Sequence, residues 1–88
     1  MANHKSAEKR IRQNEKRRLR NKRIRTAMRT VVKNCRTALE GSDVEDARTK
    51  FIAAERSLRR AASKGIVPKA RVDRAVSRLA KRLNALSS

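Results

Sequence analysis

Lysine and arginine are the side chains of this sequence best placed to do chemistry, and the chemistry open to them is phosphate binding. The first 25 residues hold 11 Lys or Arg and 2 Glu, so their net charge of +9 is half of the chain's +18. A helix turns by about 100° per residue, which spreads the following residues around its whole circumference: Lys9, Arg10, Arg12, Lys16, Arg17, Arg18, Arg20, Lys22 and Arg23. A helix that is basic on every side suits a position between phosphate-lined walls, and we expect it to be frayed until a polyanion orders it.

Residues for catalysis, metal binding or redox chemistry are few. His4 is the single histidine and Cys35 the single cysteine, so there is no His/Cys cluster for a metal. No nucleophile stands in a pattern with a base and an orienting group, and we expect no enzymatic activity, metal or cofactor. Cys35 lies on an apolar stripe, which predicts a small buried residue, and a lone cysteine fits a reducing compartment. The chain lacks the apolar run of a signal peptide and the ~20 apolar residues of a membrane span, which indicates a cytosolic protein.

A long first helix must position most of the basic residues. The pattern predicts it from Ser6, as an N-cap with Glu8 in the first turn, to about Glu40, and Gly41 is expected to end it in the left-handed conformation. Its second half becomes amphipathic, with apolar residues spaced by three and four: Ile24, Met28, Val31, Cys35 and Ala38. Four basic residues are predicted roughly opposite that stripe, namely Arg25, Arg29, Lys33 and Arg36. The helix would be about 50 Å long, so its basic end should project beyond the rest.

Two shorter helices are predicted after the first. Ser42 to Glu45 has the form of a capping box, with serine at the N-cap of the second helix and glutamate three residues later. The apolar stripe of that helix is Val44, Ala47, Phe51, Ala54, Leu58 and Ala61, and Lys64 with Gly65 ends it. Pro68 suits the first turn of the third helix, whose stripe is Val72, Val76, Leu79, Leu83 and Leu86. A basic stripe turned away from it favours contact with a polyanion: Arg71, Arg74, Arg78, Lys81 and Arg82.

Three amphipathic helices joined by short turns can bury their stripes only against one another. The sequence therefore predicts an all-α fold, an antiparallel three-helix bundle with a long, protruding basic N-terminal helix. We expect one domain over residues 1–88, with residues 1–23 as a basic arm continuous with the first helix and residues 24–88 as the body. Four acidic residues gather at the turn after the first helix, and we expect that end to face away from a polyanion: Glu40, Asp43, Glu45 and Asp46.

Three classes of polyanionic partner can be compared. With Phe51 as the only aromatic residue, the chain cannot bind nucleic acid by stacking many bases, so it should recognise the shape of a phosphate backbone. Structural RNA fits this best, and a nonspecific DNA-binding or DNA-condensing protein is the alternative. A zipper-type transcription factor is less favoured, because the apolar seam spans only about two heptads before Gly41. A membrane-surface helix needs a larger apolar face than Ile11 and Leu19 provide in the arm.

Several blocks of the chain carry a resemblance to a known family. They are Ala2-Asn3-His4-Lys5-Ser6-Ala7, the run Lys9-Arg10-Ile11-Arg12-Gln13-Asn14-Glu15-Lys16-Arg17-Arg18, Arg20-Asn21, Arg23, Lys64-Gly65-Ile66 and Ser77-Arg78-Leu79. Over essentially its whole length the chain resembles the S-twenty family of bacterial small-subunit ribosomal proteins, and the opening block is the most specific. The resemblance implies a three-helix bundle that binds 16S rRNA directly and stabilises its folded arrangement during assembly. It implies a monomer within the cytoplasmic ribosome, with no membrane, cofactor or small-molecule substrate.

The resemblance and the basic faces together give the expected rRNA contacts. By residue match the resemblance assigns them to Lys5, Lys9, Arg10, Arg12, Lys16, Arg17, Arg18, Arg20 and Arg23 in the arm, and to Lys64 and Arg78 in the body. The basic character of the helices adds Lys22, Arg25, Arg29, Lys69, Arg71, Arg74, Lys81 and Arg82. After Gly65-Ile66 the family usually continues with a His-Lys-Asn-like stretch, whereas this chain has Val67-Pro68-Lys69-Ala70. A contact made by that histidine or asparagine has no matching residue here, although Lys69 can still reach a phosphate.

Overall fold

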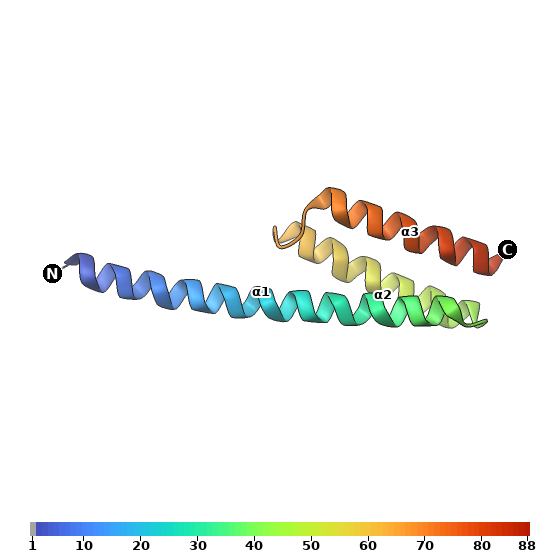
Figure 1. The fold of residues 1–88 in the computed structure, drawn as a ribbon, viewed down its shortest axis with the longest axis horizontal. Helices are drawn as coiled ribbons and strands as arrows, with labels where there is room; N and C mark the ends of the chain where they lie inside the picture. Colours follow the sequence, from blue (N-terminus) through green and yellow to red (C-terminus); the bar gives the residue numbers. More distant parts are fainter. Residues whose placement is uncertain (1) are drawn as a thin grey trace.

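A computed structural model describes the backbone of residues 2–88 and the side chains of residues 4–88. Residues 2–88 form three helices, α1 (Ala2–Glu40), α2 (Val44–Ser63) and α3 (Lys69–Ser87), and each runs antiparallel to the one before it (Figure 1). The molecule measures 67 × 20 × 13 Å. α1 lies along the long axis, and its N-terminal part extends well beyond α2 and α3 (Figure 1). The predicted all-α antiparallel bundle with a long, protruding first helix is confirmed.

The first helix begins earlier than the sequence pattern indicated. α1 already includes Ala2, so the prediction that Ser6 is its N-cap is wrong, and Glu8 lies beyond a first turn that holds no acidic residue. No glycine or proline occurs before Gly41 to interrupt the helix, and so it extends back past a serine that can cap but need not. Glu8 instead pairs with the preceding turn, where its Oε1 atom lies 3.2 Å from Nε2 of His4.

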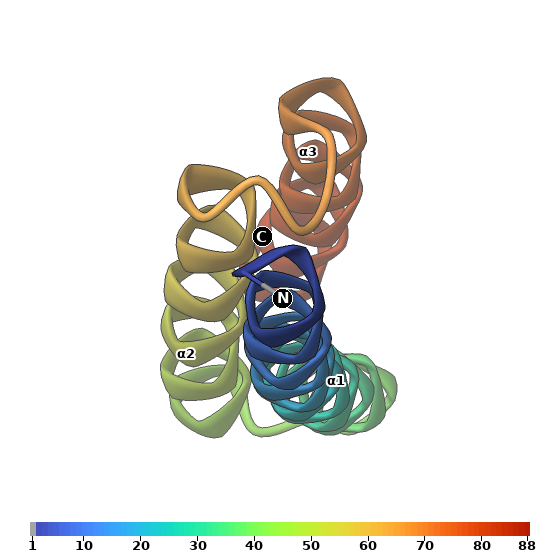
Figure 2. The ribbon, with the colours of Figure 1, turned by 90° about the vertical axis from the view of Figure 1, so that its left-hand side faces the viewer.

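The core is built from all three helices and contains the predicted stripes of α2 and α3, except for Val44 of α2, which is half-buried but not part of the core. Its buried members are Cys35, Leu39, Ala47, Ala54, Leu58, Ala61, Val67, Val72, Val76, Leu79 and Leu83. On α1 the predicted stripe needs correction, because Val32 and Leu39 pack in the core while Val31, although half-buried, is not part of it. The reason is visible in Figure 2, where α2 lies beside α1 and α3 lies above it, so α1 must pack against two neighbours at once.

Cys35 is fully buried between the helices, as the apolar stripe predicted. Burial raises the pKa of its thiol, and the nearby positive charges of Arg82 and Arg36 oppose that shift. Because burial dominates, the thiol stays protonated at neutral pH and acts as a small apolar side chain. The two arginines approach it from different helices, α3 and α1.

The turns between the helices differ in detail from those expected. The N-cap of α2 is Asp43 rather than Ser42, since the Asp43 carboxylate accepts a hydrogen bond of 3.1 Å from the Asp46 backbone N–H. Gly41 does not adopt the left-handed conformation predicted for it, whereas Gly65 does, with φ of 75°. At Gly65 the chain ends α2 with two backbone hydrogen bonds, Gly65 N–H to the Ala62 carbonyl (3.0 Å) and Ile66 N–H to the Ala61 carbonyl (2.9 Å).

The connection from α2 to α3 contributes to the core. Val67 lies between the two helices and is buried together with the core residues of the helices. Pro68 stands at the N-cap of α3, one residue before the first turn that was predicted for it, and its carbonyl accepts hydrogen bonds from the N–H groups of Arg71 and Val72. The fixed φ of proline and the burial of Val67 therefore hold the start of α3 against the other helices.

The cap assignment gives a direct prediction for stability. Replacing Asp43 with Ala should lower the free energy of unfolding by about 1 kcal/mol, because the Asp46 N–H loses its acceptor. The matched variant Ser42→Ala should change it by no more than a few tenths of that amount. The urea-unfolding midpoints of the two variants and the parent protein measure both effects, and a larger loss in Ser42→Ala would restore serine as the cap.

Candidate nucleic-acid interface

The N-terminal part of α1 presents a rod of basic side chains to solvent on all sides. Every residue from His4 to Arg20 is exposed. The predicted contact residues of this arm are all helical and point away from any packed surface: Lys5, Lys9, Arg10, Arg12, Lys16, Arg17, Arg18, Arg20, Lys22 and Arg23. Arg18 has a local partner, because its Nη2 atom lies 3.4 Å from the Glu15 carboxylate. Such a pair on the surface is weak enough to exchange readily for a phosphate contact.

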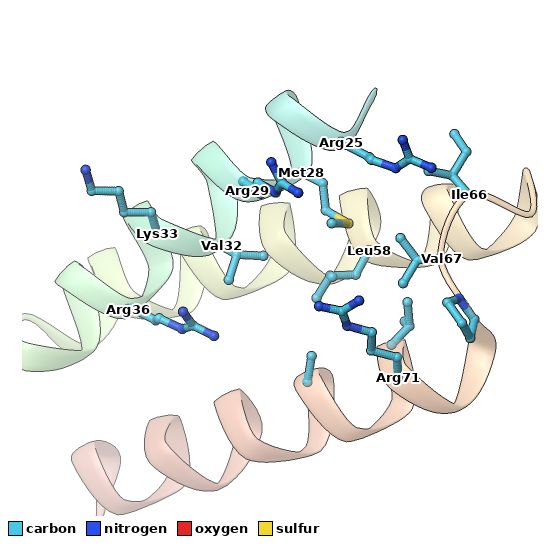
Figure 3. A pocket seen from close by; sticks show the side chains of 13 residues that line it. Arg25, Met28, Arg29, Val32, Lys33, Arg36, Leu58, Ile66, Val67 and Arg71 are labelled. Atoms are coloured by element: carbon cyan, nitrogen blue, oxygen red, sulfur yellow. The ribbon is translucent and has the colours of Figure 1, made fainter. Parts of the chain in front are cut away.

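A groove runs between α1 and α3 in the body of the molecule, and we call it the α1–α3 groove. Its first part is a cavity of about 460 Å³ whose floor is apolar: Met28, Val32, Leu58, Ile66, Val67, Val72 and Ala75. The rim of this part is basic and comes from both helices: Arg25, Arg29, Lys33, Arg36 and Arg71. In Figure 3 the guanidinium groups of Arg36 and Arg71 extend into the space between the helices, while Lys33 points away from it.

The groove continues along α3 as a second hollow of about 680 Å³. The two parts share Arg36, Pro68, Arg71 and Ala75, so they form one surface feature. In the second part the basic lining consists of Arg36, Arg71, Arg74, Arg78 and Arg82. Within the described part of the chain, no acidic residue lines either hollow. A one-signed positive groove of this kind stabilises an anion placed between its walls.

The structure thus places several predicted site residues differently from the sequence pattern. Arg25, Arg29, Lys33 and Arg36 do not lie opposite the apolar stripe of α1 but at its edge, because Val32 and Leu39 widen the stripe toward them. On α3, four of the five predicted basic residues border the groove, whereas Lys81 is exposed outside its lining. Lys64 and Lys69 are exposed near the connection between α2 and α3 and do not line the groove either.

Sequence reasoning left two features out of the candidate site. Arg36 was recognised as part of a basic row but not proposed as a contact, although its spacing from Arg25 and Arg29 follows the same helix face. The apolar floor of the groove was assigned wholly to the core. Apolar residues spaced by three and four identify the packing face of each helix. This spacing does not reveal that part of the face stays accessible to solvent where α1 and α3 separate.

The acidic end of the molecule lies at the turn between α1 and α2, far from the basic arm (Figure 1). Two basic residues of α2 near this end are paired with its carboxylates, since Arg48 Nη1 lies 3.1 Å from the Glu45 carboxylate and Lys50 Nζ lies 4.0 Å from that of Asp46. The charge of the protein is therefore polarised along its long axis. The prediction that this end faces away from a polyanion agrees with that polarity and stays a prediction.

Two other kinds of site are absent from the part of the chain that the structure describes. Among those residues, no group of three or more His, Cys, Asp or Glu side chains is arranged to hold a metal ion. Over the same residues, no helix combines the length and the apolar character needed to cross a membrane.

The fold and the charge distribution define a class: a small all-helical protein with a basic rod and a basic groove, both suited to phosphate. A family model described as ribosomal protein S20 matches residues 2–84. The protein named small ribosomal subunit protein bS20 from Clostridium botulinum (strain Eklund 17B / Type B) is 48% identical over 87 residues, covering 99% of this chain and 100% of the relative. The protein of the same name from Geobacter sulfurreducens is 48% identical over 86 residues, which cover 98% of this chain and 99% of the relative. The one from Shouchella clausii is 48% identical over 88 residues, which cover 100% of both chains. The chain belongs to the ribosomal protein S20 family.

Family membership confirms the resemblance noted in the sequence. A ribosomal protein of this family is a structural component rather than an enzyme, which agrees with the lack of a catalytic pattern in the sequence.

Proposed function

We propose that this protein is a structural constituent of the small ribosomal subunit, that it binds 16S rRNA directly, and that it stabilises the folded arrangement of that RNA during assembly. It acts as a monomer within the cytoplasmic ribosome. Family membership supports the ribosomal part of the proposal. The observation that carries direct RNA binding is the helical arm, whose basic side chains are exposed around the whole circumference of α1.

Electrostatic neutralisation is the proposed mechanism. Where RNA helices crowd together their phosphates repel, and a basic rod placed between them lowers that repulsion from several sides at once. Arginine outnumbers lysine in the arm, and its planar guanidinium binds phosphate through two parallel hydrogen bonds, which fixes orientation as well as charge. The rod should recognise the shape of the backbone with few base contacts.

We propose a division of labour along the chain. Residues 1–23 act as the arm that lies between RNA segments, and residues 24–88 act as the body that docks through its basic faces. The proposed contact residues of the arm are Lys5, Lys9, Arg10, Arg12, Lys16, Arg17, Arg18, Arg20, Lys22 and Arg23, and those of the body are Arg25, Arg29, Lys64, Lys69, Arg71, Arg74, Arg78, Lys81 and Arg82. The hydrophobic cluster, whose first member on α1 is Ile24, supports this boundary.

Competition between RNA and DNA tests the proposal. Binding of the whole protein to 16S rRNA is measured from low to moderate salt, with duplex DNA and 23S rRNA as competitors of matched nucleotide concentration. We expect 16S rRNA to be preferred increasingly as salt rises, because salt removes nonspecific phosphate binding first. Equal competition by DNA at every salt concentration would contradict the proposal and favour a nonspecific nucleic-acid condenser.

A further inference from the structure

The α1–α3 groove combines two chemistries that a simple phosphate-binding surface does not need together. Its rim carries arginines from two helices, and its floor exposes the half-buried apolar side chains of Met28, Val32, Ile66 and Ala75. A duplex backbone resting on the rim would neutralise the arginines but leave the apolar floor in contact with water. The groove therefore suits a ligand that is anionic at one side and flat and weakly polar at the other.

The positive charges face one another across the groove without acidic partners. Arg36 of α1 and Arg82 of α3 both line the second hollow, so the two helices that border the groove each contribute a guanidinium to it. Asp73 of α3 is engaged elsewhere, since its Oδ1 atom lies 3.6 Å from Nη1 of Arg59 on α2, and it does not line the groove. The like charges that line the groove repel one another, and an anion bound among them is attracted to all of them.

The size and the lining of the groove fit a nucleotide. The first hollow is about 460 Å³, within the range of small-molecule sites. A guanidinium plane stacks on a nucleobase much as an aromatic ring does, and the flexible thioether of Met28 adapts to a flat surface. An acidic protein segment would also neutralise the basic rim of the groove. We favour a nucleotide because the arm of this chain is proposed to bind RNA phosphates. RNA also supplies a phosphate for the rim and a base for the apolar floor in one unit.

We propose that the α1–α3 groove holds one unstacked nucleotide of the bound RNA. Its base lies on the floor against Met28 and Val32, and its phosphate lies between Arg36 and Arg71. This assignment rests on the proposed function, and it adds a single base contact to a protein that otherwise recognises backbone shape. The groove thereby fixes the register of the body on the RNA, which the arm with its uniform charge cannot do.

Filling the groove without changing charge tests the assignment. Ala75 is half-buried and lines both hollows, so Ala75→Phe places a ring where the base would lie. The matched control is Ala53→Phe, which adds the same ring to an exposed position of α2 outside the groove. We expect Ala75→Phe to weaken binding to 16S rRNA about 10-fold or more, the scale of losing one stacked base, while Ala53→Phe binds like the parent. Circular dichroism and thermal unfolding check that both variants are folded.

Chemical probing of the RNA gives a second measurement, and its first result comes from the unaltered protein alone. Bound to the unaltered protein, 16S rRNA should show one unpaired base protected from dimethyl sulfate or carbodiimide, and that base should become reactive again with Ala75→Phe but not with Ala53→Phe. Protection of the sugar–phosphate backbone alone, or undiminished affinity of a folded Ala75→Phe protein, would overturn the groove assignment and leave the proposed function intact. Failure of the unaltered protein to prefer 16S rRNA would instead overturn the proposed function.

Discussion

Removal of residues 1–23 should strongly weaken 16S rRNA binding and should flatten its dependence on salt. The deleted segment contains ten Lys or Arg residues and two Glu. Each phosphate that a protein neutralises contributes about 0.9 to the slope of log affinity against log salt. If half of the basic residues meet a phosphate, the slope should fall by about 4.5, with an affinity loss on the order of 10³-fold at low salt.

The structure indicates that this deletion leaves the body folded. Residues 4–20 are exposed, and the apolar side chains of α1 that pack on the core begin at Ile24. Thermal unfolding of the truncated protein should therefore resemble that of the parent. The arm helix has no packing to support it, so neutralisation by RNA phosphate is what we expect to stabilise it.

A charge control separates the arm from basic residues in general. The double variant Arg48→Gln and Lys50→Gln removes two positive charges at the acidic end, where both are paired with carboxylates. We expect it to change the salt slope by less than about 1, because these residues neutralise no phosphate. If truncation and this control lowered the slope by the same amount per charge removed, net charge rather than the arm would account for binding.

Leu79→Asp should unfold the body, which is the largest expected effect on stability. Leu79 is only 4% exposed and lies in the core with the other buried residues of α3. An aspartate there loses the apolar burial and must either hold an unpaired charge away from water or take up a proton, at a cost of at least about 4 kcal/mol. A small domain of this size has roughly 5 kcal/mol to lose. The helical circular dichroism signal at 25 °C should therefore fall sharply.

The matched control for Leu79→Asp is Ser77→Asp, which adds the same charge two residues earlier at an exposed position of α3. This variant should remain folded and unfold within about 0.5 kcal/mol of the parent. A folded Leu79→Asp protein that still binds RNA would mean that the packing face of α3 has been assigned wrongly.

The sequence by itself determined the fold class and the direction of the chemistry. Apolar residues at intervals of three and four defined the inner faces of α2 and α3, since a helix period leaves one solution for each stripe. The 26 basic residues and the near absence of aromatics predicted a polyanionic partner that is bound mainly through its phosphates. The opening block of residues indicated the family. These features depend only on residues that are close together in the sequence, so they can be recognised without knowledge of the tertiary structure.

Tertiary structure decided which of two neighbouring residues takes a given role where both residue types suit it. Ser42 and Asp43 can both cap a helix, and the path of the turn brought the Asp43 carboxylate to the Asp46 N–H. Val31 and Val32 both extend the stripe of α1, and the position of α1 against two neighbours selected Val32. The groove is the clearest case, because its basic rim and apolar floor come from α1, α3 and the connection near Val67. No single stretch of sequence specifies it, since it exists only where two helices packed on a third diverge.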